Sequence, residues 1–276
     1  MRPRIVEFFM HQIGAGFFVP DYAITLSIAI VVGLYLATRQ AERTGETEKV
    51  FRACMIIIVA ALISSRLYVV VQYRDYSREQ PLEIFQIWKG GLASYGAYLG
   101  GGVAAILAAK WQRLSVGKFL DCCAPAVALA IGIGRIGCFL NGCCHGKISN
   151  LPWAMSFPED SGPYFSHLHE GLIAPGQLSL AVHPTQLYES VFALLLFFFL
   201  LQYRKNQKRD GELFAMLFLL YSLGRFVIEF LRDDDRGTIF FLSLPQAISI
   251  FVALIALGFL LARRRESRFA DGLQVV

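Results

Sequence analysis

The chain has 276 residues, of which 55% are hydrophobic and 17% are charged, and its mean hydropathy is +0.51. A soluble domain of this size has too small a core to bury so much apolar surface, so the composition indicates a membrane protein. The formal net charge is +5, but the basic residues are divided among four loop ends, which argues against a nucleic-acid-binding surface.

Seven apolar segments are long enough to cross a bilayer, which takes roughly 20 residues per helix. They cover approximately 21–38, 54–72, 92–109, 119–140, 184–203, 212–231 and 240–262. Most connections between them are short. We therefore predict an all-α polytopic membrane protein with seven transmembrane helices, in which residues 1–276 form a single transmembrane domain. The longest connection, 146–182, is expected to form a small cap on the outer side.

The positions of lysine and arginine predict the orientation, because basic residues accumulate in cytoplasmic loops. The connections after the first, third, fifth and seventh segments hold 15 of the 26 basic residues, whereas the loop 146–182 holds only Lys147. We therefore expect the amino terminus outside the membrane, on the periplasmic side, and the carboxyl terminus in the cytoplasm.

Two tyrosines stand near the outer ends of the first three helices. Tyr22 opens the first helix, where a tyrosine is also typical of the interfacial aromatic belt. The outer segment 73–91 is compatible with a short interfacial helix. It leads into GGLASYGAYLGGG, Gly90–Gly102, whose glycines allow close helix packing and irregular backbone lining a cavity. Tyr95 places a hydroxyl among these glycines, so we consider it a candidate site residue.

The fourth helix ends in the stretch IGIGRIGCFLNGCCHG, residues 131–146, which carries Arg135 and Asn141. An ionisable residue in a membrane-spanning helix is costly and marks a functional site by default. Arg135 either forms an internal salt bridge or holds an anion in a cavity, and we favour the anion. The glycines also match the dinucleotide pattern GxGxxG, but no strand precedes them, so we reject a nucleotide site.

The fifth helix opens with HPTQLYE, whose proline is compatible with a first helical turn. His183, Gln186 and Glu189 follow one another at spacings of three residues, so they can share one helix face. A single histidine at such a position would usually be structural. Three polar groups entering a span rich in phenylalanine and leucine instead indicate a functional cluster.

The sixth helix ends in YSLGRFVIEFLR, in which Arg225, Glu229 and Arg232 form one charged stripe. An internal ion ladder would explain this stripe in purely structural terms. Two arginines and one carboxylate, however, leave a positive charge over, and that surplus suits a phosphate, which arginine binds in a forked geometry.

Under the predicted orientation, polar groups from five helices lie toward the outer leaflet. Their common depth implies a cavity open to lipid, in which Arg135 and Arg225 would hold an anionic head group. The spacing alone is compatible with a lipid-modifying enzyme and with a lipid transporter.

The motifs GGLASYG, GRIGCFLNG, HPTQLYE and YSLGRFVIEFLR, in this order across nearly the whole chain, resemble the bacterial phosphatidylglycerol–prolipoprotein diacylglyceryl transferases. The resemblance implies a multi-pass enzyme of the bacterial inner membrane that uses no metal and no nucleotide cofactor. Its expected substrates are phosphatidylglycerol, among the membrane lipids, and prolipoproteins that bear a lipobox cysteine. The reaction would form a diacylglyceryl thioether on that cysteine and release glycerol phosphate.

The resemblance also assigns roles to residues. Arg135 and Arg225 would hold the phosphate and stabilise its charge as the carbon–oxygen bond breaks, while Glu229 and Arg232 would order Arg225 and the head group. Tyr22 and Asn141 would line the cavity, and we group His183, Gln186 and Glu189 with the substrate-binding residues. Tyr95 stands where some members have a histidine proposed as the base. Since tyrosine has a pKa near 10, either an arginine lowers that pKa or the substrate thiol is deprotonated in another way.

Cysteines set this chain apart from many members, which read GRIGNF and then NGE, because Cys138 and Cys143 replace the asparagine and the glutamate. A zinc set that includes Cys144 and His145 lacks the usual two-residue cysteine spacing, so we expect no metal. A disulfide from Cys138 to Cys143 or Cys144 fits the oxidising outer side. Two other functions stay open at this stage: a thiol-redox protein built on these cysteines, and a lipid-binding or flipping protein without chemistry.

Overall fold

The computed structural model describes residues 21–72, 93–233, 238–239 and 241–273, and a helix occupies each of the seven apolar segments. Residues 1–20 and the proposed interfacial helix at 73–91 lie outside the described residues. The long helices are α2 (Asp21–Ala41), α3 (Thr47–Gln72), α5 (Ser94–Trp111), α6 (Val116–Leu140), α8 (Thr185–Tyr203), α9 (Glu212–Glu229) and α10 (Leu244–Leu273). The shorter elements are η1 (Glu42–Thr44), α7 (Gly162–His169), η4 (Arg204–Asn206), β1 (Thr238–Ile239) and β2 (Leu242–Ser243).

Five of these helices, α2, α3, α6, α8 and α10, have the length and the hydropathy needed to cross a membrane. The other two, α5 and α9, have 18 residues each. Large apolar side chains point outward from the candidate spans, as Phe198 on α8 (62% exposed) and Phe251 on α10 (65% exposed) do. Such surfaces are stable against lipid rather than water. The all-α polytopic class is therefore confirmed, whereas the full count of seven spans stays a prediction.

The chain forms two compact units, of which one comprises residues 34–123. Within it α3 and α5 pack closely along their lengths. A Cβ atom at Gly96 would lie 2.5 Å from the Ser64 carbonyl oxygen, and one at Gly100 would lie 1.9 Å from Ser64 Oγ. These glycines therefore serve close helix packing, as their sequence pattern indicated.

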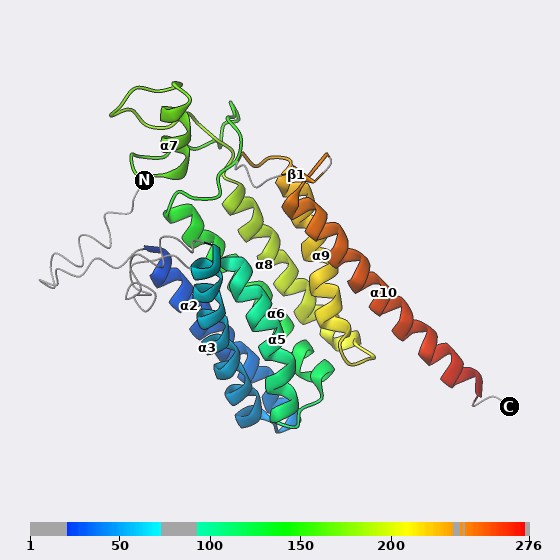
Figure 1. Cartoon of the computed structure of the whole chain (residues 1–276). Coiled ribbons are helices and arrows are strands. Elements are labelled where there is room, and N and C mark those ends of the chain that lie inside the picture. Colours follow the sequence, from blue (N-terminus) through cyan, green and yellow to red (C-terminus); the bar gives the residue numbers. More distant parts are fainter. Residues whose placement is uncertain (1–20, 73–92, 234–237, 240, 274–276) are drawn as a thin grey trace, which may run out of the picture. The chain divides into compact units, whose positions relative to one another are not determined.

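The second unit comprises residues 1–33 and 124–276. Helices α8, α9 and α10 run beside one another in it (Figure 1). Gly224 of α9 receives the Phe192 ring of α8, since a Cβ atom there would lie 2.3 Å from a ring carbon. Helix α6 is joined to α8 by the Ser190 hydroxyl, which donates to the Gly132 carbonyl at 2.8 Å. These close approaches bring polar groups of α6, α8 and α9 together.

The loop 146–182 folds into a small structure built around α7, beyond the ends of α6 and α8 (Figure 1). Ser161 caps α7, since its hydroxyl accepts a hydrogen bond from the Tyr164 amide. Met155 and Val182 exchange backbone hydrogen bonds at 3.0 Å. The expected cap is therefore folded, and its position outside the membrane stays a prediction.

The last helix begins later than predicted, because Thr238–Ile239 and Leu242–Ser243 form a short antiparallel pair, β1–β2, before α10 starts at Leu244. Ser243 and Gln246 form a capping box, in which the Gln246 amide donates to Ser243 Oγ at 3.3 Å and the Ser243 amide donates to Gln246 Oε1 at 3.0 Å. Helix α10 therefore starts at Leu244, after the approximate bound of 240, and the sequence Ser-Leu-Pro-Gln carries the signal for this start.

Candidate functional site

Glu189 is the buried centre of a charged contact between three helices. Its side chain on α8 has no exposed surface, and its Oε1 lies 2.8 Å from the Arg135 guanidinium of α6. The Tyr221 hydroxyl of α9 donates to the same oxygen at 2.5 Å. Arg135 therefore forms the internal salt bridge that the sequence left open, and that contact holds its guanidinium in a fixed position.

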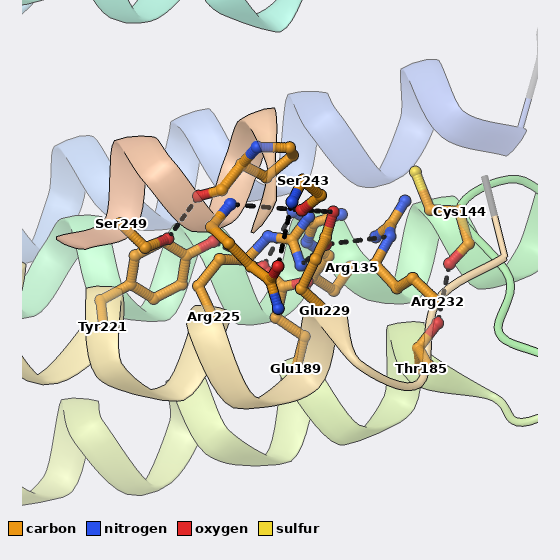
Figure 2. Close-up of polar contacts among 12 residues, drawn as sticks. Arg135, Cys144, Thr185, Glu189, Tyr221, Arg225, Glu229, Arg232, Ser243 and Ser249 are labelled. Atoms are coloured by element: carbon orange, nitrogen blue, oxygen red, sulfur yellow. Dashed lines mark hydrogen bonds and ion pairs between the residues drawn. The ribbon is translucent and has the colours of Figure 1, made fainter. Parts of the chain in front are cut away.

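The predicted stripe forms a second buried cluster (Figure 2), in which Arg225 and Glu229 lie on α9 and Arg232 follows the end of that helix. Arg225 Nη1 lies 2.5 Å from Glu229 Oε2, in an ion pair rather than an aligned hydrogen bond, and Arg232 Nε lies 3.6 Å from the same oxygen. The Ser243 hydroxyl donates to Glu229 Oε1 at 3.1 Å. All three charged residues are at most 8% exposed. Glu229 thus pairs with both arginines, whereas the role of Glu229 and Arg232 in ordering Arg225 and the head group stays a prediction.

The two clusters are joined through α9, because Tyr221 and Arg225 are four residues apart and share a helix face. Figure 2 shows their side chains together between the helices. The joined set contains three arginines, Arg135, Arg225 and Arg232, and two glutamates. Its formal charge is therefore positive, and a low-dielectric surrounding strengthens its attraction for an anion.

Gln186 does not join the charged set but holds the turn that follows α6. Its amide donates to the Cys143 carbonyl at 2.7 Å, and the neighbouring Thr185 hydroxyl donates to the Cys144 carbonyl at 2.8 Å. Both side chains are fully buried. Asn141 lies at the end of α6 and is exposed. The role of Gln186 in positioning this turn was not predicted.

The cysteines of that turn are near one another but are not bridged. Cys138, Cys143 and Cys144 are free and half-buried, and their Sγ atoms all lie within 4.8 Å of one another. The structure therefore contains none of the disulfides considered for them. His145 is buried, and its Nδ1 contacts the Gly146 carbonyl at 3.2 Å.

His183 and Tyr22 lie near the same end of this unit, with other partners. His183 Nδ1 lies 3.3 Å from the Tyr188 hydroxyl, which also accepts a hydrogen bond from Trp153. Tyr22 lies beside α6, because a Cβ atom at Gly137 would lie 3.2 Å from its ring. Tyr22 therefore lies beside Gly137, which precedes Asn141 by one helical turn, whereas His183 lies against Tyr188, the partner of Trp153 in the cap.

Tyr95 lies on α5 in the other compact unit, where it is half-buried. Its assignment as the base stays a prediction. Two site residues that the sequence did not single out are Tyr221 and Ser243. The sequence does contain a signal for Tyr221, because it precedes Arg225 by one helical turn and so shares its helix face. It contains no signal for the contact between Ser243 and Glu229, because that contact depends on how α10 packs.

Comparison with known proteins gives consistent matches over nearly the whole length. The sequence matches the family model described as prolipoprotein diacylglyceryl transferase over residues 9–262. It is 34% identical over 259 residues to the phosphatidylglycerol–prolipoprotein diacylglyceryl transferase of Clostridium tetani, covering 93% of this chain and 96% of that protein. A protein of the same name from Corynebacterium diphtheriae is 33% identical over 254 residues, covering 87% and 88% of the two chains.

Proposed function

Because the chain belongs to the prolipoprotein diacylglyceryl transferase family, we propose that it transfers the diacylglyceryl group of phosphatidylglycerol to a cysteine thiol of a prolipoprotein. The acceptor is the lipobox cysteine, the product is a thioether, and glycerol phosphate leaves. Family membership favours this function over a thiol-redox protein and over a lipid-binding or flipping protein without chemistry.

The observation that carries the proposal is the buried set of three arginines and two glutamates. Each glutamate fixes an arginine, through Arg135–Glu189 at 2.8 Å and Arg225–Glu229 at 2.5 Å. The carboxylates therefore orient the guanidinium groups without cancelling their total charge. A phosphodiester carries one negative charge, which matches the surplus of one positive charge in this set.

The reaction breaks the bond between a glycerol carbon and a phosphate oxygen, so negative charge grows on the leaving phosphate. Arg135 and Arg225 stabilise that charge, and donors fixed before the reaction are effective because they need little reorganisation. Arg232 supports the head group through Glu229. Tyr22 and Asn141 line the substrate region at the end of α6, and Tyr95 is the candidate base.

We further propose that the seven helices form one domain in the bacterial inner membrane, with the reaction at the outer leaflet. The basic residues after α2, α5, α8 and α10 support this orientation. The charged set lies toward the opposite ends of the helices, near the start of α8 and the end of α9.

The test is transfer in proteoliposomes that contain the purified protein, phosphatidylglycerol and a lipobox peptide. A thioether-linked diacylglyceryl peptide should form together with glycerol phosphate, and a peptide with serine in place of the cysteine should stay unmodified. Arg135→Ala and Arg225→Ala should each lower the rate by about 100-fold or more, the range for loss of one charge-stabilising donor.

Arg39→Ala is the matched control, because Arg39 also pairs with a glutamate, Glu42, at 3.0 Å but is solvent-exposed on the opposite end of α2. Its rate should equal that of the wild type. Full activity of a correctly folded Arg225→Ala variant would refute the phosphate role, and the absence of transfer by the wild type would refute the proposed function.

A further inference from the structure

The end of α6 gathers three thiols that the phosphate site does not use. Cys138 belongs to the last turn of the helix, and Cys143 and Cys144 follow the helix after Asn141 and Gly142. Their three Sγ atoms all lie within 4.8 Å of one another. Among the residues that the structure describes, no histidine or carboxylate joins this set within that distance.

The backbone explains why a spacing of five residues brings two thiols together. The Gly142 amide donates to the Phe139 carbonyl at 3.1 Å, and the Cys143 amide donates to the Cys138 carbonyl at 3.1 Å. With Gly142 in the left-handed region at φ +66°, this is a Schellman motif. That motif brings the residue after the left-handed glycine close to the residue four positions before this glycine, which here are Cys143 and Cys138.

The third thiol is held by a strained and tethered backbone. Cys144 has φ +61°, a conformation that costs a non-glycine residue about 1–2 kcal/mol. Two fully buried side chains at the start of α8 hold the turn, because Gln186 donates to the Cys143 carbonyl and Thr185 to the Cys144 carbonyl. Strain kept in place by such contacts is typical of a functional position.

We propose that Cys138, Cys143 and Cys144 bind a zinc ion whose fourth coordination position is open. A tetrahedral zinc with Zn–S bonds of about 2.3 Å holds its sulfurs about 3.8 Å apart, so small side-chain rotations close the site. Three protein ligands with a fourth position for water or substrate characterise catalytic rather than structural zinc. The two-residue spacing of common zinc motifs is unnecessary here, because the Schellman turn replaces it.

The location gives the open position a role that rests on the proposed transferase function. Cys138 follows Arg135 by three residues on α6, and Gly146, two residues after Cys144, pairs with Arg232 in a backbone bridge, so the sulfurs border the proposed phosphate site. A lipobox thiol that binds the zinc gives its proton to solvent and stays bound as the thiolate. Its sulfur then forms a bond to the glycerol carbon while the carbon–oxygen bond breaks, and that electron pair leaves on glycerol phosphate. The zinc and the three cysteines are unchanged, and no strong protein base is needed.

Metal content is the first test. The full-length protein, purified after growth with added zinc, should hold about one zinc per chain. Replacing all three cysteines with serine should abolish binding, and Cys143→Ser alone should weaken it by more than about 100-fold, since even changes outside the ligand shell cost 10–100-fold. Cys54→Ser is the matched control, because Cys54 is a free cysteine on α3 outside the cluster.

Two results would overturn the zinc site. They are a folded wild type that binds no zinc although all three thiols react with an alkylating reagent, and a disulfide among the three found by mass spectrometry without reductant. The triple variant removes three thiols from one turn, so the single variants provide a test that does not depend on the folding of the triple variant. Variants that elute from a size-exclusion column at the wild-type volume are counted as folded.

The open position is tested with Co²⁺ in place of zinc. Addition of the lipobox peptide should increase the thiolate-to-cobalt charge-transfer absorption, and the peptide with serine at the acceptor position should not. Equal spectra with both peptides would overturn the substrate-binding role. Transfer that persists after zinc removal would also overturn it. If the cobalt spectrum responds as expected but zinc-loaded protein transfers no lipid, the zinc site stands and the proposed transferase function fails.

Discussion

At the scale of single residues, the charged groups act as pairs rather than as separate ligands. The sequence posed structural and anion-binding roles for Arg135 as alternatives, but its ion pair with Glu189 is compatible with both. A guanidinium has five donors, so a contact with a carboxylate and a contact with an anion do not exclude each other. Removing one partner of a buried pair is more harmful than removing both, because it leaves an uncompensated charge.

Tyr221 provides a direct test of this arrangement. Its hydroxyl donates to Glu189 at 2.5 Å, and hydrogen bonds to charged groups contribute about 1.5–3 kcal/mol, so Tyr221→Phe should lower the free energy of unfolding by that amount. Because Glu189 also holds Arg135, the transfer rate should fall by roughly tenfold, which corresponds to about 1.4 kcal/mol. The measurements are denaturant unfolding in detergent and the lipobox-peptide assay.

A matched tyrosine lies at the other end of α8. The Tyr203 hydroxyl donates to Glu212 at 2.7 Å, so Tyr203→Phe loses the same kind of bond far along the helix from the charged set. It should lower stability by a similar amount and leave the transfer rate unchanged. Equal loss of rate in both variants would show that Tyr221 acts only through stability.

At the scale of elements, two glycines with the same backbone conformation separate strain from packing at the end of α6. Gly142 and Gly171 have φ of +66° and +71°. A Cβ atom at Gly142 would lie 2.7 Å from the Ser161 Cβ, whereas one at Gly171 meets nothing within 4 Å. Gly171→Ala should therefore cost only the left-handed strain, about 1–2 kcal/mol. Gly142→Ala should cost about 1–3 kcal/mol more through overpacking.

The measurement is the free energy of unfolding of both variants in the same detergent. Only Gly142→Ala should also weaken zinc binding, because only Gly142 belongs to the Schellman turn that places the thiols. Equal destabilisation by the two substitutions would mean that α7 moves freely away from the turn.

The cap contains a histidine that makes its stability depend on pH. His167 is 1% exposed, and burial, together with the nearby His145, lowers its pKa below the usual 6.5, although Glu170 and Asp233 act in the opposite direction. Its Nδ1 accepts a hydrogen bond from the Leu180 amide at 3.2 Å, which the protonated ring cannot do. Below pH 6.5 the unfolded chain binds a proton that the folded cap does not. The contribution of His167 is therefore present above that pH and is lost as the pH falls.

The expected result is a drop in wild-type Tm between about pH 7.5 and about pH 5 that is larger than in His167→Asn, which keeps an acceptor and does not titrate. Each kcal/mol corresponds to about 2–4 °C for a chain of this size. His169→Asn is the control, since His169 is exposed and should behave as the wild type does. Identical pH dependence in all three proteins would contradict the role of His167.

At the scale of the whole molecule, the sequence predicted the helices and all five members of the charged set for one physical reason. Long apolar segments are specified by composition, and a charge within them is too costly to be accidental, so Arg135, Glu189 and Arg225 could be identified without coordinates. The contact between Arg135 and Glu189 could not be predicted, because the two residues are 54 positions apart and helical periodicity does not specify which helices pack together.

Other features depend on local geometry that composition does not reveal. The cap lacks apolar periodicity, so its fold depends on contacts such as the Met155–Val182 pairing. The convergence of the thiols requires the left-handed backbone of Gly142, which spacing rules for cysteine ligands ignore. Helix α10 began later than expected, although the capping box at Ser243 was present in the sequence.

The orientation of the whole molecule gives the last prediction. Leu178 is 61% exposed in the loop 146–182, and Lys205 is exposed in the basic connection after α8. If basic residues keep their connections in the cytoplasm, Leu178→Cys should react with a membrane-impermeant maleimide on intact cells whose outer barrier is open, and Lys205→Cys should react only after the inner membrane is permeabilised. The unsubstituted protein reports the reactivity of its own thiols. The reverse pattern would place the arginine set at the cytoplasmic leaflet and would contradict the proposed site of lipid transfer.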